Sequence, residues 1–158
     1  METTRHYVAT VYVVNDGATA LHHHDRLDMW LPPGGHVERD ELPHVAAQRE
    51  VREELGLPVE LVGAAGPFDT DTVESIPDPQ HFLLEDINVH ADGGVSHQHV
   101  DFVYYGRVPR RAIEPADGEQ AAEDWEWLTP EAIDATGDRL KPDVEAMARE
   151  AIRTVGRR

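Results

Sequence analysis

The chain has 158 residues, and its 31 Asp plus Glu against 14 Lys plus Arg give a formal net charge of −17. This length fits a single domain over residues 1–158, the acidity argues against nucleic acid as a partner, and the lack of cysteine excludes disulfides and thiol chemistry. No apolar run approaches the roughly 18 residues that span a membrane, and the first residues show no signal-peptide pattern, so we expect a cytoplasmic protein without a membrane partner.

The N-terminal segment predicts a β-hairpin. Tyr7–Val14 is rich in β-branched side chains, which is typical of a strand, and we place this strand at the centre of a sheet. Asn15–Gly17 is a strong turn signal. The chain then returns as a second strand over Ala18–His23.

Three consecutive histidines, His22–His24, stand at the end of this hairpin. Successive residues of a strand point to opposite faces, so the three side chains do not converge easily on one metal ion. We interpret His22 as a substrate-binding residue near phosphates or a nucleobase, where a protonated imidazole would suit an anion. Plain solvent exposure of the three side chains is the alternative.

A helix is predicted over Pro43–Leu55, after a rigid turn at Trp30–Gly35. Proline is tolerated in the first helical turn, and Gly56 is a natural residue just beyond the C-terminus. Leu42 precedes the helix, where a Ser, Thr or Asp cap would be more usual. The apolar stripe that should face the core consists of Ala47, Val51 and Leu55.

Three carboxylates of this helix, Glu50, Glu53 and Glu54, fall within one arc of about 100°. Like charges at such spacings disfavour a helix by roughly 0.2–0.5 kcal/mol per pair, and a divalent cation would remove that penalty. Hard ions such as Mg²⁺ take oxygen ligands from carboxylates, water and phosphates. The sequence therefore predicts a Mg²⁺ platform, with Mn²⁺ as a substitute. The alternative is a solvated acidic face, because 16 of the 158 residues are Glu.

The same stretch carries a longer pattern, Gly35-x5-Glu41-x7-Arg49-Glu50-Val51-x-Glu53-Glu54-x-Gly56-Leu57. This pattern resembles the signature of the Nudix hydrolases at every defining position. The resemblance implies an α/β fold, namely an α/β/α sandwich with a mixed central sheet, over about residues 5–155. It also implies Mg²⁺-dependent hydrolysis of a nucleoside diphosphate linked to another group, with a nucleotide-type small molecule as the substrate.

The resemblance also implies roles for individual residues. The implied metal ligands are the carboxylates of Glu50, Glu53 and Glu54 and the backbone carbonyl of Gly34. Glu50 and Glu53 are candidate catalytic carboxylates as well. We expect Arg49 to pair with Glu41 and to position Glu50 and the diphosphate, so Arg49 is both a catalytic and a substrate-binding candidate. A purely structural ion pair is the alternative.

After the helix, residues 66–80 contain three prolines and several acidic residues. We predict a long loop there that borders the substrate pocket, because long loops usually serve a function. Strands are predicted on either side of it, over Val59–Val62 and Phe82–His90.

His97–Val108 reads as a further strand, with His97, His99 and Asp101 on one face. We predict that His97 and His99 bind the substrate or support a second metal shell. A hydrogen-bonded polar face without such a role is the alternative.

The resemblance also implies one more carboxylate from a loop outside the signature, and we expect the loop over residues 109–122 to supply it. Glu119 is the preferred catalytic candidate, Glu123 is the second, and Asp101 is the third because its strand face is not expected to reach the reaction. The remaining predicted elements are a strand at Glu123–Leu128, a short helix at Pro130–Ala135 and an amphipathic helix at Lys141–Val155.

The substrate is less well defined than the chemistry. Some Nudix subfamilies carry a marker proline or a marker tyrosine after the signature. The corresponding stretch here, Thr70–Ser75, contains neither residue. A nucleoside triphosphate or oxidised-nucleotide pyrophosphohydrolase is the remaining interpretation. The alternative is a Nudix-fold nucleotide-binding or regulatory domain without hydrolysis, which the intact signature disfavours. A homodimer is left open.

Lysine is almost absent from the chain. Lys141 is the only lysine, against 13 Arg and 31 acidic residues. Uniform acidity of this kind suggests a halophilic protein, because high salt screens self-repulsion. An ordinary acidic enzyme is the alternative.

Overall fold

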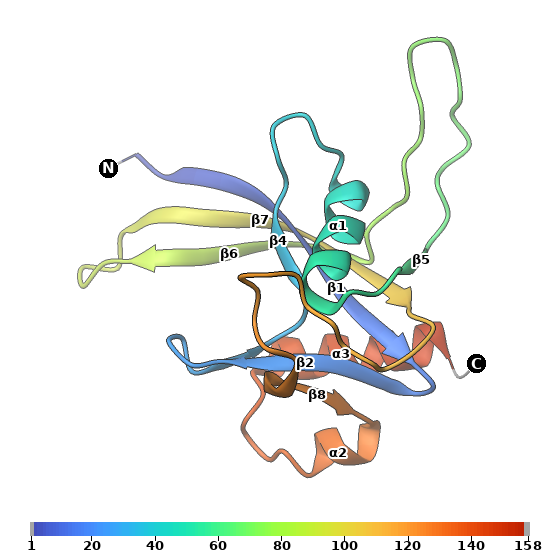
Figure 1. The fold of residues 1–158 in the computed structure, drawn as a ribbon. Helices are drawn as coiled ribbons and strands as arrows, with labels where there is room; N and C mark the ends of the chain where they lie inside the picture. Colours follow the sequence, from blue (N-terminus) through green and yellow to red (C-terminus); the bar gives the residue numbers. More distant parts are fainter. Residues whose placement is uncertain (1, 157–158) are drawn as a thin grey trace.

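The computed structural model describes residues 2–156, which form a mixed β-sheet between helices (Figure 1). The strands are β1 (Thr4–Asn15), β2 (Ala18–His24), β3 (Met29–Leu31), β4 (Gly34–His36), β5 (Glu60–Val62), β6 (His81–Val89), β7 (Val95–Arg107) and β8 (Trp125–Leu128). The helices are α1 (Pro43–Leu55), α2 (Pro130–Asp134) and α3 (Pro142–Val155), with a 3₁₀ turn at Ala122–Asp124.

The sheet has the order β3-β2-β1-β7-β5, with β4 beside β1, β6 beside β7 and β8 beside β2. β1 and β7 run parallel through 11 residue pairs, while the other pairs are antiparallel. The mixed sheet and the central place of β1 are therefore confirmed. The turn between β1 and β2 has positive φ at Asp16 (44°) and Gly17 (79°), as a tight hairpin of the predicted kind requires.

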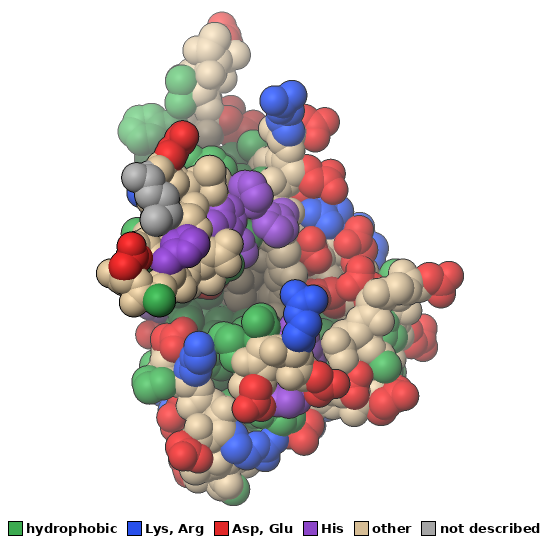
Figure 2. Space-filling model, turned by 90° about the vertical axis from the view of Figure 1, so that its left-hand side faces the viewer, with side chains coloured by type: hydrophobic (Ala, Val, Ile, Leu, Met, Phe, Trp, Pro, Cys, Tyr) green, Lys and Arg blue, Asp and Glu red, His purple; other side chains and the backbone are tan. Residues whose placement is uncertain are grey.

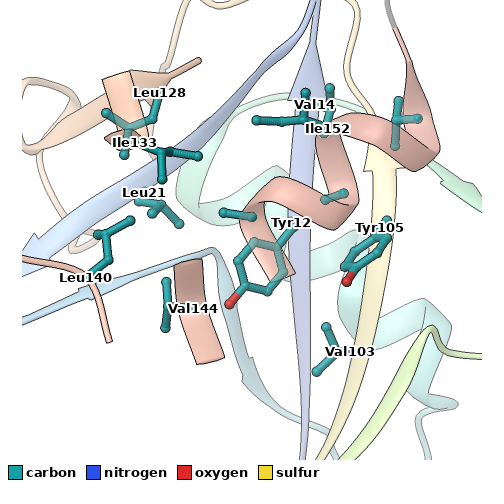
Figure 3. Packing of buried hydrophobic residues seen from close by; sticks show 13 residues of the cluster. Tyr12, Val14, Leu21, Val103, Tyr105, Leu128, Ile133, Leu140, Val144 and Ile152 are labelled. Carbon is teal, nitrogen blue, oxygen red and sulfur yellow. The ribbon is translucent and has the colours of Figure 1, made fainter. Parts of the chain in front are cut away.

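Successive residues of β1 supply two separate cores. Tyr12 and Val14 pack with α3 and α2 on one face, whereas Val11 and Val13 pack with α1 on the other. Figure 3 shows Tyr12 beside Tyr105 of β7, with Ile152 of α3 close to Val14. This arrangement is the α/β/α sandwich that the sequence predicted.

Both long helices turn their apolar stripes to the sheet. The buried residues of α3 are Val144, Ala148, Ala151, Ile152 and Val155, and those of α1 are Ala46, Ala47, Val51 and Leu55. Full burial of a Val or Leu side chain stabilises the fold by about 1.5–3 kcal/mol, so these stripes fix both helices on the sheet. No helix within residues 2–156 is long and apolar enough to cross a membrane.

α1 has the predicted boundaries. Leu42 gives the helix no side-chain cap, and Pro43 begins it. Gly56 ends it in the left-handed conformation at φ 68° and donates its N–H to the Arg52 carbonyl. A Cβ at this position would also collide with the carbonyl of Glu114. Glycine is therefore required both for its left-handed conformation and for this close approach.

One edge of β1 is shared by two strands. β4 pairs with Val8–Thr10, and β2 pairs with Val14–Asn15 further along the same edge. Between them the Val11 N–H donates to the Pro33 carbonyl at 2.9 Å. Because β2 and β4 occupy successive parts of one edge, the sheet splits there. The split opens a pocket above the middle of β1.

The segment 66–80 departs from expectation. It folds back on itself through bridges between Ala65 and Pro77 and between Asp69 and Glu74. In Figure 1 it extends away from the sheet beyond β5. None of its residues lines the pocket at the split of the sheet, so the expectation that this loop borders that pocket was wrong.

Candidate active site

The pocket at the split of the sheet has a volume of about 400 Å³, within the range of about 300–1,000 Å³ that is usual for small-ligand sites. Its floor is formed by β1 and β7, its walls by β2, β4 and α3, and part of its rim by the loop before β8. Figure 2 shows a hollow with histidine side chains beside it. The polar lining residues are Thr10, Tyr12, His22, His24, His36, Glu54, Glu85, His99, Asp101, Glu119, Gln120 and Asp143.

Arg49 joins α1 to the loop that precedes it. Its Nε and Nη2 donate to the two carboxylate oxygens of Glu41 at 2.8 and 3.0 Å. Its Nη1 donates to Glu50 at 2.9 Å and to Glu53 at 3.2 Å, and Nη2 also reaches the His36 carbonyl at 3.0 Å. The Arg49 guanidinium holds the pKa of Glu41 below its usual value. The expected pair is therefore present as a two-point contact, which suits the planar guanidinium.

Glu54 is the most deeply placed carboxylate of α1. Its Oε2 accepts a hydrogen bond from the Gly34 N–H at 2.8 Å, and its Oε1 has no hydrogen-bond partner within residues 2–156. Burial raises the pKa of Glu54 to about 8, and the nearby carboxylates of Glu50, Glu119 and Glu53 add to the rise. Arg49 contacts the other two glutamates of the helix but not this one. Glu54 thus lacks a cationic partner in the part of the chain that the structure describes.

The surroundings of Glu50 complete this acidic centre. Burial raises the pKa of Glu50 despite the opposing charge of Arg49. A Cβ at Gly35 would collide with the Glu50 carboxylate, so the glycine provides the space in which that carboxylate lies. Partly buried carboxylates that have more negative than positive charge around them suit a hard divalent cation as ligands. The oxygens of Glu50, Glu53 and Glu54 therefore fit Mg²⁺ or Mn²⁺.

Glu119 lines the pocket together with Glu54, whereas Glu123 is exposed and outside the lining. The loop that carries Glu119 is hydrogen-bonded to the end of α1. The Glu114 N–H donates to the Leu55 carbonyl at 2.8 Å, and the Ala116 N–H donates to the Glu53 carbonyl at 2.8 Å. The preference for Glu119 over Glu123 therefore agrees with the geometry.

The histidines of the first hairpin alternate as expected. His22 is buried and lines the pocket with His24, whereas His23 lies within hydrogen-bonding distance of Asp25 and Asp28. The carboxylate of Asp28, followed by that of Asp25, raises the pKa of His23. Burial, with the charge of His24, lowers the pKa of His22. A neutral His22 can accept or donate a hydrogen bond, but it is a weak partner for phosphate charge.

The two histidines of β7 lie in different places. His99 lines the pocket, and its pKa is lowered by burial and by His36. His97 lies outside the lining, and its Nδ1 is 2.8 Å from the Thr4 hydroxyl. Of the two, only His99 is placed to contact a molecule in the pocket.

Asp101 lines the pocket, although the sequence made it only the third candidate for the additional carboxylate. Its Oδ2 accepts a hydrogen bond from the Thr10 hydroxyl at 2.9 Å, and its Oδ1 is buried without a partner in the described chain. Burial, followed by a hydrogen bond with the Glu85 carboxyl and by the charge of that carboxyl, raises the pKa of Asp101 to about 8. The His22 Nδ1 is likewise buried and unpartnered. Only the alternation of β7 could have indicated Asp101, since Thr10 and Glu85 come from distant parts of the sequence.

The chain is thus an α/β/α sandwich whose helix α1 carries three clustered carboxylates that suit a divalent cation as ligands. A family model described as the NUDIX domain matches residues 4–153. The chain therefore belongs to the Nudix family, whose members are pyrophosphohydrolases that generally depend on a divalent metal. It is accordingly an enzyme of the hydrolase class, and the resemblance in the sequence is confirmed.

Solved structures support the same assignment. A hydrolase of the NUDIX family from Clostridium perfringens is 29% identical, with a TM-score of 0.79, and the match covers 97% of this chain and 99% of that one. The MutT protein of Methanosarcina mazei Go1 matches at 16% identity and a TM-score of 0.65, over 99% of each chain. The dihydroneopterin triphosphate pyrophosphohydrolase of E. coli matches at 20% identity and 0.61, over 98% and 97%. These last two likenesses concern the fold alone. No curated protein sequence matches the chain significantly.

Proposed function

We propose that this enzyme hydrolyses a nucleoside diphosphate linked to another group, in a Mg²⁺-dependent reaction in which water attacks a phosphorus of the diphosphate. A nucleoside triphosphate or an oxidised nucleotide is the substrate class. The observation that carries the proposal is Glu54, a partly buried carboxylate without a cationic partner in the described chain, which lines a pocket of about 400 Å³.

The metal would be held by Glu50, Glu53 and Glu54, with the Gly34 carbonyl as a further ligand. When bound, Mg²⁺ neutralises phosphate charge and lowers the pKa of a coordinated water. Arg49 keeps the carboxylates of Glu50 and Glu53 in place through its two-sided contact with them and with Glu41. Mn²⁺ has the same preference for oxygen and can replace Mg²⁺.

Proton transfer is assigned to a carboxylate outside the helix. Glu119 lines the pocket with Glu54, and the charge of Glu119 contributes to the raised pKa of Glu54. Both side chains face the same pocket, and we assign to Glu119 the acceptance of a proton from the attacking water. This is the usual role of a positioned carboxylate in general base catalysis.

The floor of the pocket is assigned to the nucleobase. Apolar side chains, among them Leu31 and Val103, offer a surface for a flat ring. The Oδ1 atom of Asp101 would make a hydrogen bond to a polar group of the base, and the His22 Nδ1 would supply a second polar contact. Both atoms are unpartnered in the described chain, and a bound base would remove the cost of leaving them so.

A panel of nucleoside diphosphate derivatives, assayed with Mg²⁺ and with both products identified, tests the reaction and its substrate. We expect Glu54→Gln and Glu50→Gln each to lower turnover at least ~10²-fold, since the metal contributes several kcal/mol to catalysis. Glu53→Gln should impair turnover less. The matched control is Glu74→Gln in the 66–80 segment. Full activity of Glu54→Gln with normal metal dependence would refute the proposed metal centre.

Recognition of the nucleobase is tested separately, through the KM of the enzyme for its substrate. Asp101→Ala should raise KM with little change in kcat, because it removes a contact made to the substrate at every stage. Asp101→Asn keeps a hydrogen-bonding group in the same position and should keep KM near the wild-type value. Equal KM values for the alanine and wild-type enzymes would exclude a contact between Asp101 and the substrate.

Properties of the whole protein belong to the same proposal. The single lysine and the net charge of −17 support activity in high salt. The cytoplasmic location and the homodimer remain predictions. Cell fractionation and sedimentation velocity are the measurements that check them.

A further inference from the structure

Three histidines from three different strands meet on one face of the sheet. One ring nitrogen each from His6, His36 and His99 lies within 4.8 Å of the other two. The ring centroids are 5.1 Å apart for His6 and His36, 5.3 Å for His36 and His99, and 6.5 Å for His6 and His99. Figure 2 shows histidine side chains gathered beside the hollow. We call these three residues the histidine cluster.

The strand register places the cluster. His6 of β1 is directly paired with His99 of β7, and His36 of β4 is paired with Val8, two residues along β1 from His6. Paired residues of neighbouring strands present their side chains on the same face of a sheet. His6 and Val8 share a face because side chains alternate along a strand. The cluster is therefore fixed by backbone pairing and does not depend on loop conformation.

The ring nitrogens of the cluster make no polar contact with other groups in the described part of the chain. Within residues 2–156, none of the three rings takes part in a hydrogen bond or an ion pair with the protein. The neighbouring His97 differs, because its Nδ1 is engaged by the Thr4 hydroxyl. His6 and His36 are exposed and His99 is half-buried, so an ion from solvent can reach all three.

The chemistry of the cluster differs from that of the carboxylates on α1. Imidazole nitrogens suit Zn²⁺ and neighbouring transition metals, whereas carboxylates suit Mg²⁺. Zn–N bonds of about 2.0–2.1 Å place the nitrogens of a tetrahedral site roughly 3.4 Å apart. To reach this spacing, each ring nitrogen of the cluster would have to move by much less than the length of an imidazole ring. Small side-chain rotations allow such a shift.

We propose that His6, His36 and His99 form a second metal site, which binds Zn²⁺ or a similar divalent transition-metal ion through three imidazoles. The site goes beyond the proposed hydrolase function, which uses the carboxylate centre. His36 and His99 also line the pocket, so the fourth coordination position is open to water or to a ligand in the pocket. Three protein ligands and an open position form an exchangeable site, in contrast to the closed four-ligand type.

Calorimetric titration of the metal-free protein with Zn²⁺, in excess Mg²⁺, tests this site. Excess Mg²⁺ occupies oxygen ligands and leaves the imidazoles to zinc. We expect one tight equivalent of Zn²⁺, weakened at least about 100-fold in His99→Ala and in His36→Ala, because loss of a ligand exceeds the 10–100-fold effect of losing its supporting partner. His6→Ala changes an exposed side chain and should give the same loss without disturbing the fold.

A spectroscopic measurement and matched controls complete the test. Co²⁺ in place of Zn²⁺ should show the visible absorption of a four-coordinate ion, and this absorption should vanish in the three cluster variants. His90→Ala, which changes a histidine outside the cluster, and Glu54→Gln should both keep the tight equivalent. Equal zinc affinity in wild type and His99→Ala would overturn the proposal. Loss of the equivalent in Glu54→Gln would also overturn it, because zinc would then occupy the carboxylate centre.

Discussion

The substitution Asp101→Asn tests whether the Asp101 carboxyl on the pocket floor is protonated, and the test needs only the free energy of unfolding. Asp101 is only 4% exposed, and burial together with Glu85 raises its pKa to about 8. In the unfolded chain the same carboxyl has an ordinary pKa of about 3.9. Between these two values the folded protein holds one proton that the unfolded chain has released.

The sign of the effect follows from that proton. The stabilisation is fully present below about pH 3.9 and is lost as the pH rises through the folded pKa. With one more proton in the folded state, the free energy of unfolding falls by about 1.4 kcal/mol per pH unit. From about pH 5 to about pH 7 this amounts to a loss of about 3 kcal/mol. Asparagine has no proton to gain or lose, so the Asp101→Asn protein lacks this contribution.

Urea unfolding, followed by tryptophan fluorescence at fixed salt, measures the effect at several pH values. We expect the stability difference between wild type and Asp101→Asn to move by about 3 kcal/mol across that range, in favour of the variant at the higher pH. Asp71→Asn, in the 66–80 segment far from the pocket, is the matched control and should show a constant difference. A constant difference for Asp101→Asn as well would show that Asp101 is ionised in the folded protein and refute this account.

Arg49→Lys should lower kcat/KM by at least about 10-fold with little change in melting temperature, because an ammonium cannot hold Glu41 at two points and still reach the helix carboxylates; steady-state kinetics beside a thermal melt measures both. Glu119→Gln should change the acid limb of the pH–rate profile and Glu123→Gln should not, and an unchanged limb in Glu119→Gln would remove Glu119 from proton transfer. The melting temperature should rise between 0.1 M and above 1 M KCl, since the Debye length shrinks from about 10 to about 3 Å. A melting temperature that stays constant or falls over this range would refute the halophilic interpretation and indicate an ordinary acidic hydrolase.

The sequence predicted best those features that neighbouring residues determine. α1 begins at Pro43 and ends before Gly56, as predicted, because both residues act on the backbone beside them. The β1–β2 hairpin formed for the same reason, through the positive φ of Asp16 and Gly17. The contact between Arg49 and Glu41 could be predicted because the signature fixes both residues near one helix.

Features that depend on strand register were not predictable. β4 is three residues long, and its two glycines after Pro33 have the sequence of a turn until β1 is placed beside them. The hydrogen bond that the Thr10 hydroxyl donates to Asp101 joins residues 91 positions apart, so the pocket floor has no local signal in the sequence. The segment 66–80 was misjudged because its self-pairing turns it away from the sheet, which proline content alone does not indicate.

The hydrogen bonds from the 114–119 loop to the end of α1 have a mechanical consequence. The amides of Glu114 and Ala116 are bonded to the last carbonyls of the helix, and the Glu119 N–H is bonded to the Ala116 carbonyl at 3.2 Å. These two hydrogen bonds tether the loop to carbonyls at the helix end that have no partner within the helix, and both must break before the loop can swing away from the pocket. We expect hydrogen exchange at the Glu114 and Ala116 amides to report how often this tether between loop and helix breaks.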